Sequence, residues 1–132
     1  MTAIRRFEDI KAWQRARELT QIVYQTTRAG EFSKDFGLTD QLRRASVSVM
    51  SNIAEGFARK SDRDFARYLD ISRGSSVEVQ SILHVAVDAG YLRKEEFQRI
   101  YTLADEIISM ISGLSSYLRR PNSGQRAPDS GL

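Results

Sequence analysis

The chain has 132 residues, of which 41% are hydrophobic and 28% charged, and its formal net charge is +3. This length and composition suit one globular domain with its own core, and the small positive charge allows a nucleic-acid partner without requiring one. Cysteine is absent, which excludes disulfides, thiolate nucleophiles and cysteine-ligated zinc.

Two helices are predicted in the first half of the chain. The first runs from about Phe7 to Ala29, with Gly30 ending it, and apolar residues recur along it at helical spacing. A loop over residues 31–37 leads to the second, which we expect to end at Gly56 because glycine accepts the left-handed conformation. The apolar stripes are Ala12, Ala16, Leu19 and Val23, then Leu38, Leu42, Ala45, Val49 and Ile53.

Two more helices are predicted in the second half. The third follows Ser61, a good N-cap residue, and closes at Gly90. Its small residues Ser72, Ser75 and Ser76 lie on the core side and would let a neighbouring helix approach closely. The fourth begins near Lys94 and ends at Arg119 and Arg120, before Pro121.

Four long helices with short connections predict an all-α, antiparallel up-down-up-down four-helix bundle. We expect the bundle to occupy residues 1–120 and residues 121–132 to form a disordered tail. Charges throughout residues 1–14 argue against a secretory signal, and no apolar run approaches the length of a membrane span. We therefore expect a cytoplasmic protein without a membrane partner.

The fourth predicted helix is apolar over a wider arc than one core-facing stripe needs. One stripe comprises Phe97, Tyr101, Ala104, Ile108 and Ile111, and a displaced one comprises Leu103, Ile107, Met110, Leu114 and Tyr117. Since extra apolar faces are usually covered, the sequence predicts an oligomer interface formed by Ile71, Val85, Leu103, Met110, Leu114 and Tyr117. The alternative is that Met110 and Tyr117 pack under loops or are partly exposed.

A basic cluster is the candidate functional site. Arg63 and Arg67 share a helix face, and basic side chains bind nucleic-acid phosphates largely independently of sequence. The cluster predicted to bind nucleic acid comprises Arg43, Arg44, Arg59, Lys60, Arg63 and Arg67. The alternative is a solvated, salt-bridged surface, because Asp62, Asp64 and Asp70 lie among these residues. Arg43 and Arg44 could instead pair with Glu55 or a neighbouring subunit.

Catalysis finds little support in the sequence. His84, the single histidine, lies one turn from Asp88, a pairing that is more often a surface hydrogen bond than a metal site. There is no glycine-rich phosphate loop of the common types. Asn52 and Glu55 are interpreted as structural, and Trp13 as core or interface packing. We expect no catalytic residue, metal or cofactor.

Several strings resemble a known family. Residues 37–80, which contain QLRRA and SNIAEG, resemble the four-helix-bundle 23S rRNA intervening-sequence proteins, as do FEDIKAWQ at Phe7–Gln14 and AGYL at Ala89–Leu92. The resemblance covers nearly all of residues 7–118. Two departures are Met50, where relatives often carry proline, and Arg93, where a serine cap is common.

The resemblance implies a bacterial four-helix protein assembled as a homopentameric ring. The family is similar to accessory proteins of diversity-generating retroelements, which assist a reverse transcriptase. Two hypotheses follow: an accessory protein binding RNA or DNA through a basic rim, or a protein-interaction scaffold without nucleic-acid binding. A hydrolase or metal enzyme is the third and weakest alternative, since it would depend on His84 holding a metal.

Overall fold

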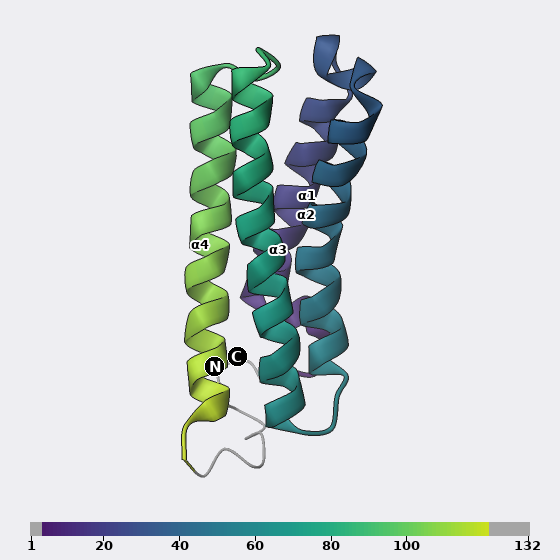
Figure 1. The fold of residues 1–132 in the computed structure, drawn as a ribbon. Helices are drawn as coiled ribbons and strands as arrows, with labels where there is room; N and C mark the ends of the chain where they lie inside the picture. Colours follow the sequence, from purple (N-terminus) through teal and green to yellow (C-terminus); the bar gives the residue numbers. More distant parts are fainter. Residues whose placement is uncertain (1–3, 122–132) are drawn as a thin grey trace.

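Four long α-helices make up most of the computed structural model, which describes residues 4–121 (Figure 1). They are α1 (Lys11–Thr27), α2 (Phe36–Phe57), α3 (Asp62–Asp88) and α4 (Lys94–Arg119), with short 3-10 helices η1 (Phe7–Asp9) and η2 (Gly30–Lys34). No strand occurs within residues 4–121, so the predicted all-α fold with four helices is confirmed. The predicted tail lies outside the described residues except for Pro121.

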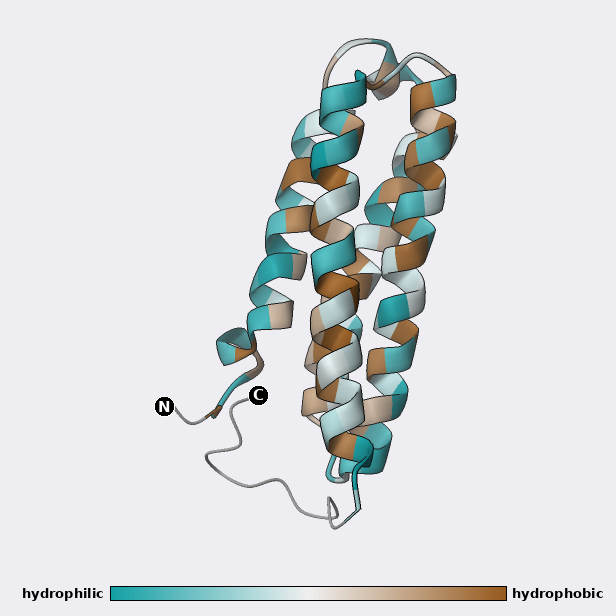
Figure 2. Ribbon diagram, turned by 90° about the vertical axis from the view of Figure 1, so that its left-hand side faces the viewer, coloured by the Kyte–Doolittle hydropathy of each residue, from teal (hydrophilic) through white to brown (hydrophobic). Residues whose placement is uncertain are grey.

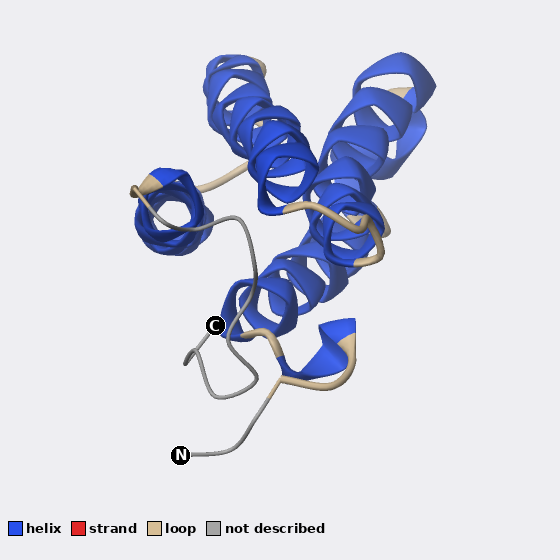
Figure 3. Ribbon diagram, turned by 90° about the horizontal axis from the view of Figure 1, so that it is seen from below, coloured by secondary structure: helices blue, strands red, loops and turns tan. Residues whose placement is uncertain are grey.

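The connections between successive helices lie alternately at the two ends of the molecule (Figure 1). The α2–α3 connection shares one end with the start of η1 and the end of α4, and the other two connections lie at the opposite end. The helices are inclined to one another in the end-on view (Figure 3). α3 packs extensively on both α2 and α4, whereas α1 packs on α2 more than on α4.

A single hydrophobic core follows the helices from end to end. Its largest fully buried side chains include Phe32, Phe65, Leu19, Ile53 and Ile107. Hydrophilic and hydrophobic residues alternate along each helix (Figure 2). The core is therefore built by the predicted amphipathic pattern.

The first helix is shorter than predicted. Asp9 accepts hydrogen bonds from the backbone N–H groups of Arg5 and Arg6, at 3.2 and 3.3 Å, which closes the separate turn η1. Ile10 is then extended and fully buried, and α1 begins only at Lys11. Trp13 is buried with its ring 5.1 Å from that of Phe7, which confirms the packing interpretation of this residue.

The start of α2 rests on Asp35, which the sequence reasoning placed in a loop. One carboxylate oxygen accepts the backbone N–H of Leu38 at 3.1 Å, and the other accepts the Tyr91 hydroxyl at 3.0 Å. The first contact is an N-cap, so α2 begins two residues before the predicted Leu38. The second ties the α1–α2 connection to the α3–α4 connection.

Gly56 does not end α2, which contradicts the prediction. It lies inside the helix without a positive φ, and α2 continues to Phe57. A β-carbon here would lie 2.7 Å from Tyr68 Cβ and 2.9 Å from Phe65 Cδ1. Glycine is required because α2 and α3 approach too closely for any side chain.

Gly90 ends the third helix as predicted. Its φ is +81°, and the N–H groups of Gly90 and Tyr91 donate to the carbonyls of Val87 and Ala86 at 3.0 and 2.9 Å. This pair of bonds is the Schellman motif, which satisfies carbonyls at the helix end. α4 then begins without a capping side chain at Arg93, and Glu96 accepts the Arg93 N–H instead, at 3.2 Å.

The small serines of α3 bind neighbouring helices. Ser72 donates to the Val49 carbonyl on α2 at 2.6 Å, and Ser76 donates to the Ala104 carbonyl on α4 at 3.3 Å. Ser75 is within 2.7 Å of Ser48 on α2. The close helix approach predicted from these residues is supported by these contacts, which span the α2–α3 and α3–α4 interfaces.

The buried face of α4 is centred between the two predicted stripes. Ile100, Leu103, Ile107, Ile111 and Leu118 are buried. Phe97 and Tyr101 on one side, and Met110 and Leu114 on the other, are half-buried against the same core. The two stripes are thus the flanks of one wide core-facing surface.

Candidate nucleic-acid interface

Four of the six predicted nucleic-acid-binding residues gather at the α2–α3 end of the molecule. Arg59 and Lys60 lie in the connection, and Arg63 and Arg67 lie in the first turns of α3. All four are exposed. We call this group, Arg59, Lys60, Arg63 and Arg67, the basic end.

Tyr68 organises two of these cations. The guanidinium carbons of Arg59 and Arg67 lie 4.7 and 5.3 Å from the centre of its ring, within cation–π range. Arg59 also donates to the Tyr68 hydroxyl. The Tyr68 Cβ lies against α2 at Gly56, so the glycine that permits close helix packing also sets the position of this ring.

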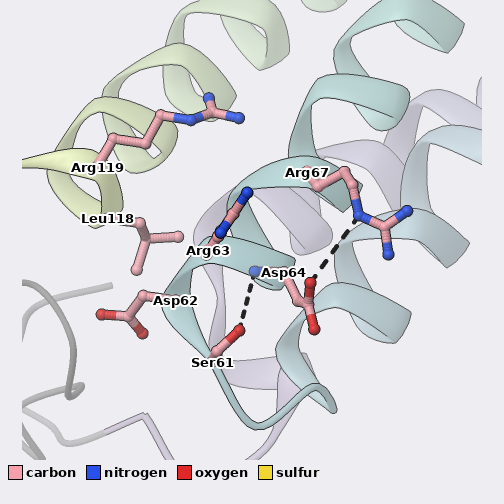
Figure 4. Close-up of a pocket in the computed structure, with 7 residues that line it drawn as sticks. All are labelled: Ser61, Asp62, Arg63, Asp64, Arg67, Leu118 and Arg119. Carbon is pink, nitrogen blue, oxygen red and sulfur yellow. Dashed lines mark hydrogen bonds and ion pairs between the residues drawn. The ribbon is translucent and has the colours of Figure 1, made fainter.

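An open hollow of about 820 Å³ lies beside the basic end, between the start of α3 and the end of α4 (Figure 4). Ser61 caps α3 there, accepting the Asp64 N–H at 3.1 Å. The residues that line the hollow are Ser61, Asp62, Arg63, Asp64, Arg67, Leu118 and Arg119. The hollow therefore mixes both signs of charge.

Acidic residues neutralise part of this surface, as the salt-bridged alternative predicts. Asp64 lies 4.0 Å from Arg67, and Arg119 makes a two-pronged contact with Asp70 at 2.6 and 3.2 Å. The hydrogen bond from Arg119 lowers the pKa of Asp70, with smaller contributions from the charges of Arg119 and Arg73. Among residues 4–121, Lys60 and Arg63 form no ion pair.

Arg43 and Arg44 do not belong to the basic end. Arg43 lies against α1, donating to the Thr27 hydroxyl at 2.8 Å with its guanidinium 4.6 Å from the Tyr24 ring centre. Arg44 pairs with Asp40 one turn earlier, at 2.8 Å, rather than with Glu55. Arg43 and Arg44 therefore make their contacts within α1 and α2, away from Arg59 and Arg67.

The predicted oligomer residues divide into three groups. Ile71 and Val85 on α3 are 47% and 52% exposed, so they are available for a partner. Met110, Leu114 and Tyr117 on α4 are half-buried, as the alternative interpretation allowed. Leu103 is buried in the protomer's own core and is not available, which corrects its assignment to an interface.

Two of the remaining polar candidates, Asn52 and His84, have structural partners. Asn52 donates to the Ser48 carbonyl at 2.9 Å, in line with its structural interpretation. The exposed His84 ring packs edge-on against Phe97 and Tyr101, with centroids 5.0 and 5.9 Å away. Within residues 4–121, no three histidine or acidic side chains gather to hold a metal.

Sequence reasoning missed Tyr68 and Arg119. Tyr68 follows Arg67 directly and lies nine residues after Arg59, so its position could be read only from the way α2 packs on α3. The Arg119–Asp70 pair joins residues 49 apart in sequence, and no local signal marks it. None of the helices in the described part of the chain has a segment suited to crossing a bilayer.

Comparison with known proteins supports the resemblance noted in the sequence. The fold is similar to that of a solved protein of unknown function from the S23 ribosomal protein family of Bacteroides thetaiotaomicron, with a TM-score of 0.73 and 22% identity over 80% of this chain and 95% of that one. No curated protein sequence matches. A family model for the 23S rRNA-intervening sequence proteins matches residues 8–113. The chain therefore belongs to the 23S rRNA-intervening sequence protein family.

Proposed function

We propose that this protein is a non-enzymatic, homo-oligomeric accessory protein that binds RNA or DNA phosphates through the basic end. One observation carries the proposal: Tyr68 holds Arg59 and Arg67 beside the exposed side chains of Lys60 and Arg63. Positioned guanidinium groups lose less side-chain entropy when they bind phosphate than mobile ones do. Phosphate contacts of this kind give affinity without base specificity.

The proposal includes an antiparallel bundle that self-associates. Helix connections that alternate between the two ends support the up-down-up-down course (Figure 1). Ile71 and Val85 supply exposed apolar side chains for a contact between copies. In the pentameric ring that the family resemblance implies, five basic ends would form one positive rim, and a reverse transcriptase is the proposed protein partner.

The test is fluorescence anisotropy of labelled structured RNA and duplex DNA at two salt concentrations. We expect salt-sensitive binding by the wild type and strong loss in the variant Arg59→Gln/Lys60→Gln/Arg63→Gln/Arg67→Gln. The control removes the same number of positive charges elsewhere, with Lys34→Gln/Arg73→Gln/Lys94→Gln/Arg99→Gln. Equal binding by the two variants, or no binding by the wild type at low salt, would reject the basic end as the site.

A protein-interaction scaffold is the second candidate, favoured by the exposed apolar Ile71 and Val85. It predicts a defined partner that co-purifies in the same amount before and after nuclease treatment. Loss of that partner in the variant Ile71→Glu/Val85→Glu, with nucleic-acid binding absent throughout, would support the scaffold over the nucleic-acid hypothesis.

A further inference from the structure

A second basic surface lies away from the basic end, in a groove of about 450 Å³ between α1 and α2. These two helices lie side by side over this region (Figure 1). We call it the α1–α2 groove, and its lining residues are Arg17, Thr20, Gln21, Tyr24, Gln25, Arg28 and Met50. Arg17, Gln21, Tyr24 and Arg28 recur at spacings of three or four, which places them along one face of α1.

No acidic residue lines the α1–α2 groove. Arg17 and Arg28 are exposed, and neither forms an ion pair within the described chain. Glu18, the acid of α1, pairs instead with Arg15, which contacts α4 through Glu106. The groove is thus positive without the local neutralisation found at the basic end.

Arg43 on α2 holds the groove residue Tyr24 in place, and is itself fixed by two contacts with α1. The Thr27 hydroxyl donates to the Val23 carbonyl at 2.7 Å and accepts from Arg43 Nε at 2.8 Å. The guanidinium lies 4.6 Å from the centre of the Tyr24 ring, and Tyr24 is still more than one-third exposed. The guanidinium covers one face of the Tyr24 ring and fixes its position, so a nucleobase can stack on the part of the ring that stays exposed.

We infer that the α1–α2 groove binds an unpaired stretch of nucleic acid. A base would stack on the exposed part of the Tyr24 ring, the phosphates would contact Arg17 and Arg28, and the amides of Gln21 and Gln25 would bond base edges. Arg17 and Arg28 are about 16 Å apart along the helix axis at ~1.5 Å per residue, room for several nucleotides. A duplex keeps its base faces inside the stack, so the groove selects single strands.

This inference rests on the proposed nucleic-acid binding but uses a different surface. Tyr68 on α3 and Arg59 in the α2–α3 connection lie where α2 contacts α3. Thr20 on α1 instead donates to the Ser46 carbonyl, on the side of α2 that faces α1. The basic end supplies phosphate contacts at one end of the molecule. The groove adds a preference for unpaired bases along its side.

The experiment uses the full chain and a fluorescein-labelled single-stranded oligouridylate, with a duplex of equal length as the comparison probe. Replacing Tyr24 by leucine should weaken single-strand binding by roughly fivefold to a hundredfold, the range for removal of one stacking platform. Duplex binding should not change. Tyr24→Phe retains the ring and should restore binding, which separates stacking from a folding defect.

Two further readouts test the phosphate contacts and the stacking itself. Arg17→Gln/Arg28→Gln should reduce the slope of log affinity against log salt by about 1.4 for a single strand, as two lost phosphate contacts predict. The charge-matched control Lys94→Gln/Arg99→Gln should leave single-strand binding close to that of the wild type. The fluorescence of a 2-aminopurine placed in the oligonucleotide should change on binding, and Tyr24→Leu should abolish that change.

The outcomes separate this inference from the proposed function. Unchanged single-strand binding in both groove variants, with loss in the basic-end variant, would overturn the groove and leave the basic end. Loss only in the groove variants would support the groove and overturn the basic end. Absence of binding by the wild type to either probe would overturn both.

Discussion

Gly56 is the one glycine among residues 4–121 at which neighbouring atoms leave no room for a β-carbon. Any other residue would place a β-carbon 2.7 Å from Tyr68 Cβ, and both atoms are fixed by their helix backbones. We expect Gly56→Ala to destabilise the protein by about 1–3 kcal/mol, because relief requires the helices to move apart. Thermal and urea unfolding followed by circular dichroism measure this loss.

Gly74 provides the matched control for that prediction. It lies inside α3, and a β-carbon there would meet nothing within 4 Å. Gly74→Ala should be neutral or stabilise the protein by up to about 1 kcal/mol, through higher helix propensity. Equal effects of the two substitutions would show that Gly56 acts through backbone freedom and not through close packing.

For single residues, the sequence predicted the burial of side chains more accurately than the contacts between them. Ser72 follows an apolar stripe, so its position in the core could be read from periodicity. Tyr68 and Arg59, and equally Tyr24 and Arg43, come together through helix packing that one sequence does not specify. Leu103 was assigned to a partner because periodicity fixes relative directions on a helix but not where the core begins and ends.

The starts of α1 and α2 were harder to predict than the end of α3. Gly90 ends α3 through a local conformation that glycine alone adopts easily, so its role could be read directly. Asp9 closes η1 ahead of α1, and Asp35 caps the start of α2, each by accepting specific backbone hydrogen bonds. An aspartate in a polar stretch has many alternative partners, which makes such a start difficult to recognise.

The Asp35 carboxylate both caps α2 and binds the Tyr91 hydroxyl. Its removal should therefore lower the stability of the fold more than the loss of an N-cap alone. Asp35→Ala removes the bond to Leu38 N–H and the bond from the Tyr91 hydroxyl. We expect a loss of about 1–2 kcal/mol in the free energy of unfolding. Asp40→Ala, which removes only an exposed pair with Arg44, should cost less than about 0.5 kcal/mol, and an equal cost would contradict the assignment.

The contact between α3 and α4 at Asp70 and Arg119 should depend on pH. The pKa of Asp70 in the folded protein is below the ordinary aspartate value of 3.8, so the ionised form stabilises the fold. This contribution is complete above the unfolded pKa and is lost as pH falls through the lower folded value. Because both side chains are half-exposed, its size should be below about 1 kcal/mol.

Comparison of the wild type with Asp70→Asn across pH measures this contribution. The difference in unfolding free energy should be constant from pH 7 to about 5 and should shrink as the pH falls below 3.8, the ordinary aspartate pKa. A difference that stays the same down to the lowest pH at which the protein folds would show that the effect is not due to ionisation of Asp70. High salt should reduce the difference at neutral pH.

For the whole molecule, the fold class and family followed from sequence, whereas the assembly stays a prediction. Amphipathic periodicity and proline-free helices specify four helices, and QLRRA and SNIAEG specify the family that the comparison supports. No local pattern distinguishes an exposed apolar residue that meets a partner from one that meets water. Exposure of Ile71 and Val85 identifies candidates but does not give a number of subunits.

Charge substitution on α3 tests that assembly. Ile71→Glu/Val85→Glu should convert an oligomer to a monomer with unchanged helicity, since a contact between copies would bury both charges without partners. Val77→Glu is the control, because Val77 is 50% exposed on the same helix but is not among the predicted interface residues. Light scattering with size-exclusion chromatography measures the mass. A wild-type monomer would contradict the proposal.

The alternation of helix connections has a practical consequence for measuring how copies are arranged. The chain has no cysteine, so one introduced cysteine at the exposed Lys94 would carry a dye at the end of the molecule opposite Lys60. The 27 residues of α3 separate these ends by about 40 Å. Energy transfer between protomers dyed at Lys94 and at Lys60 would then distinguish copies that point the same way from copies that point in opposite directions. Only the first arrangement gathers all basic ends on one rim.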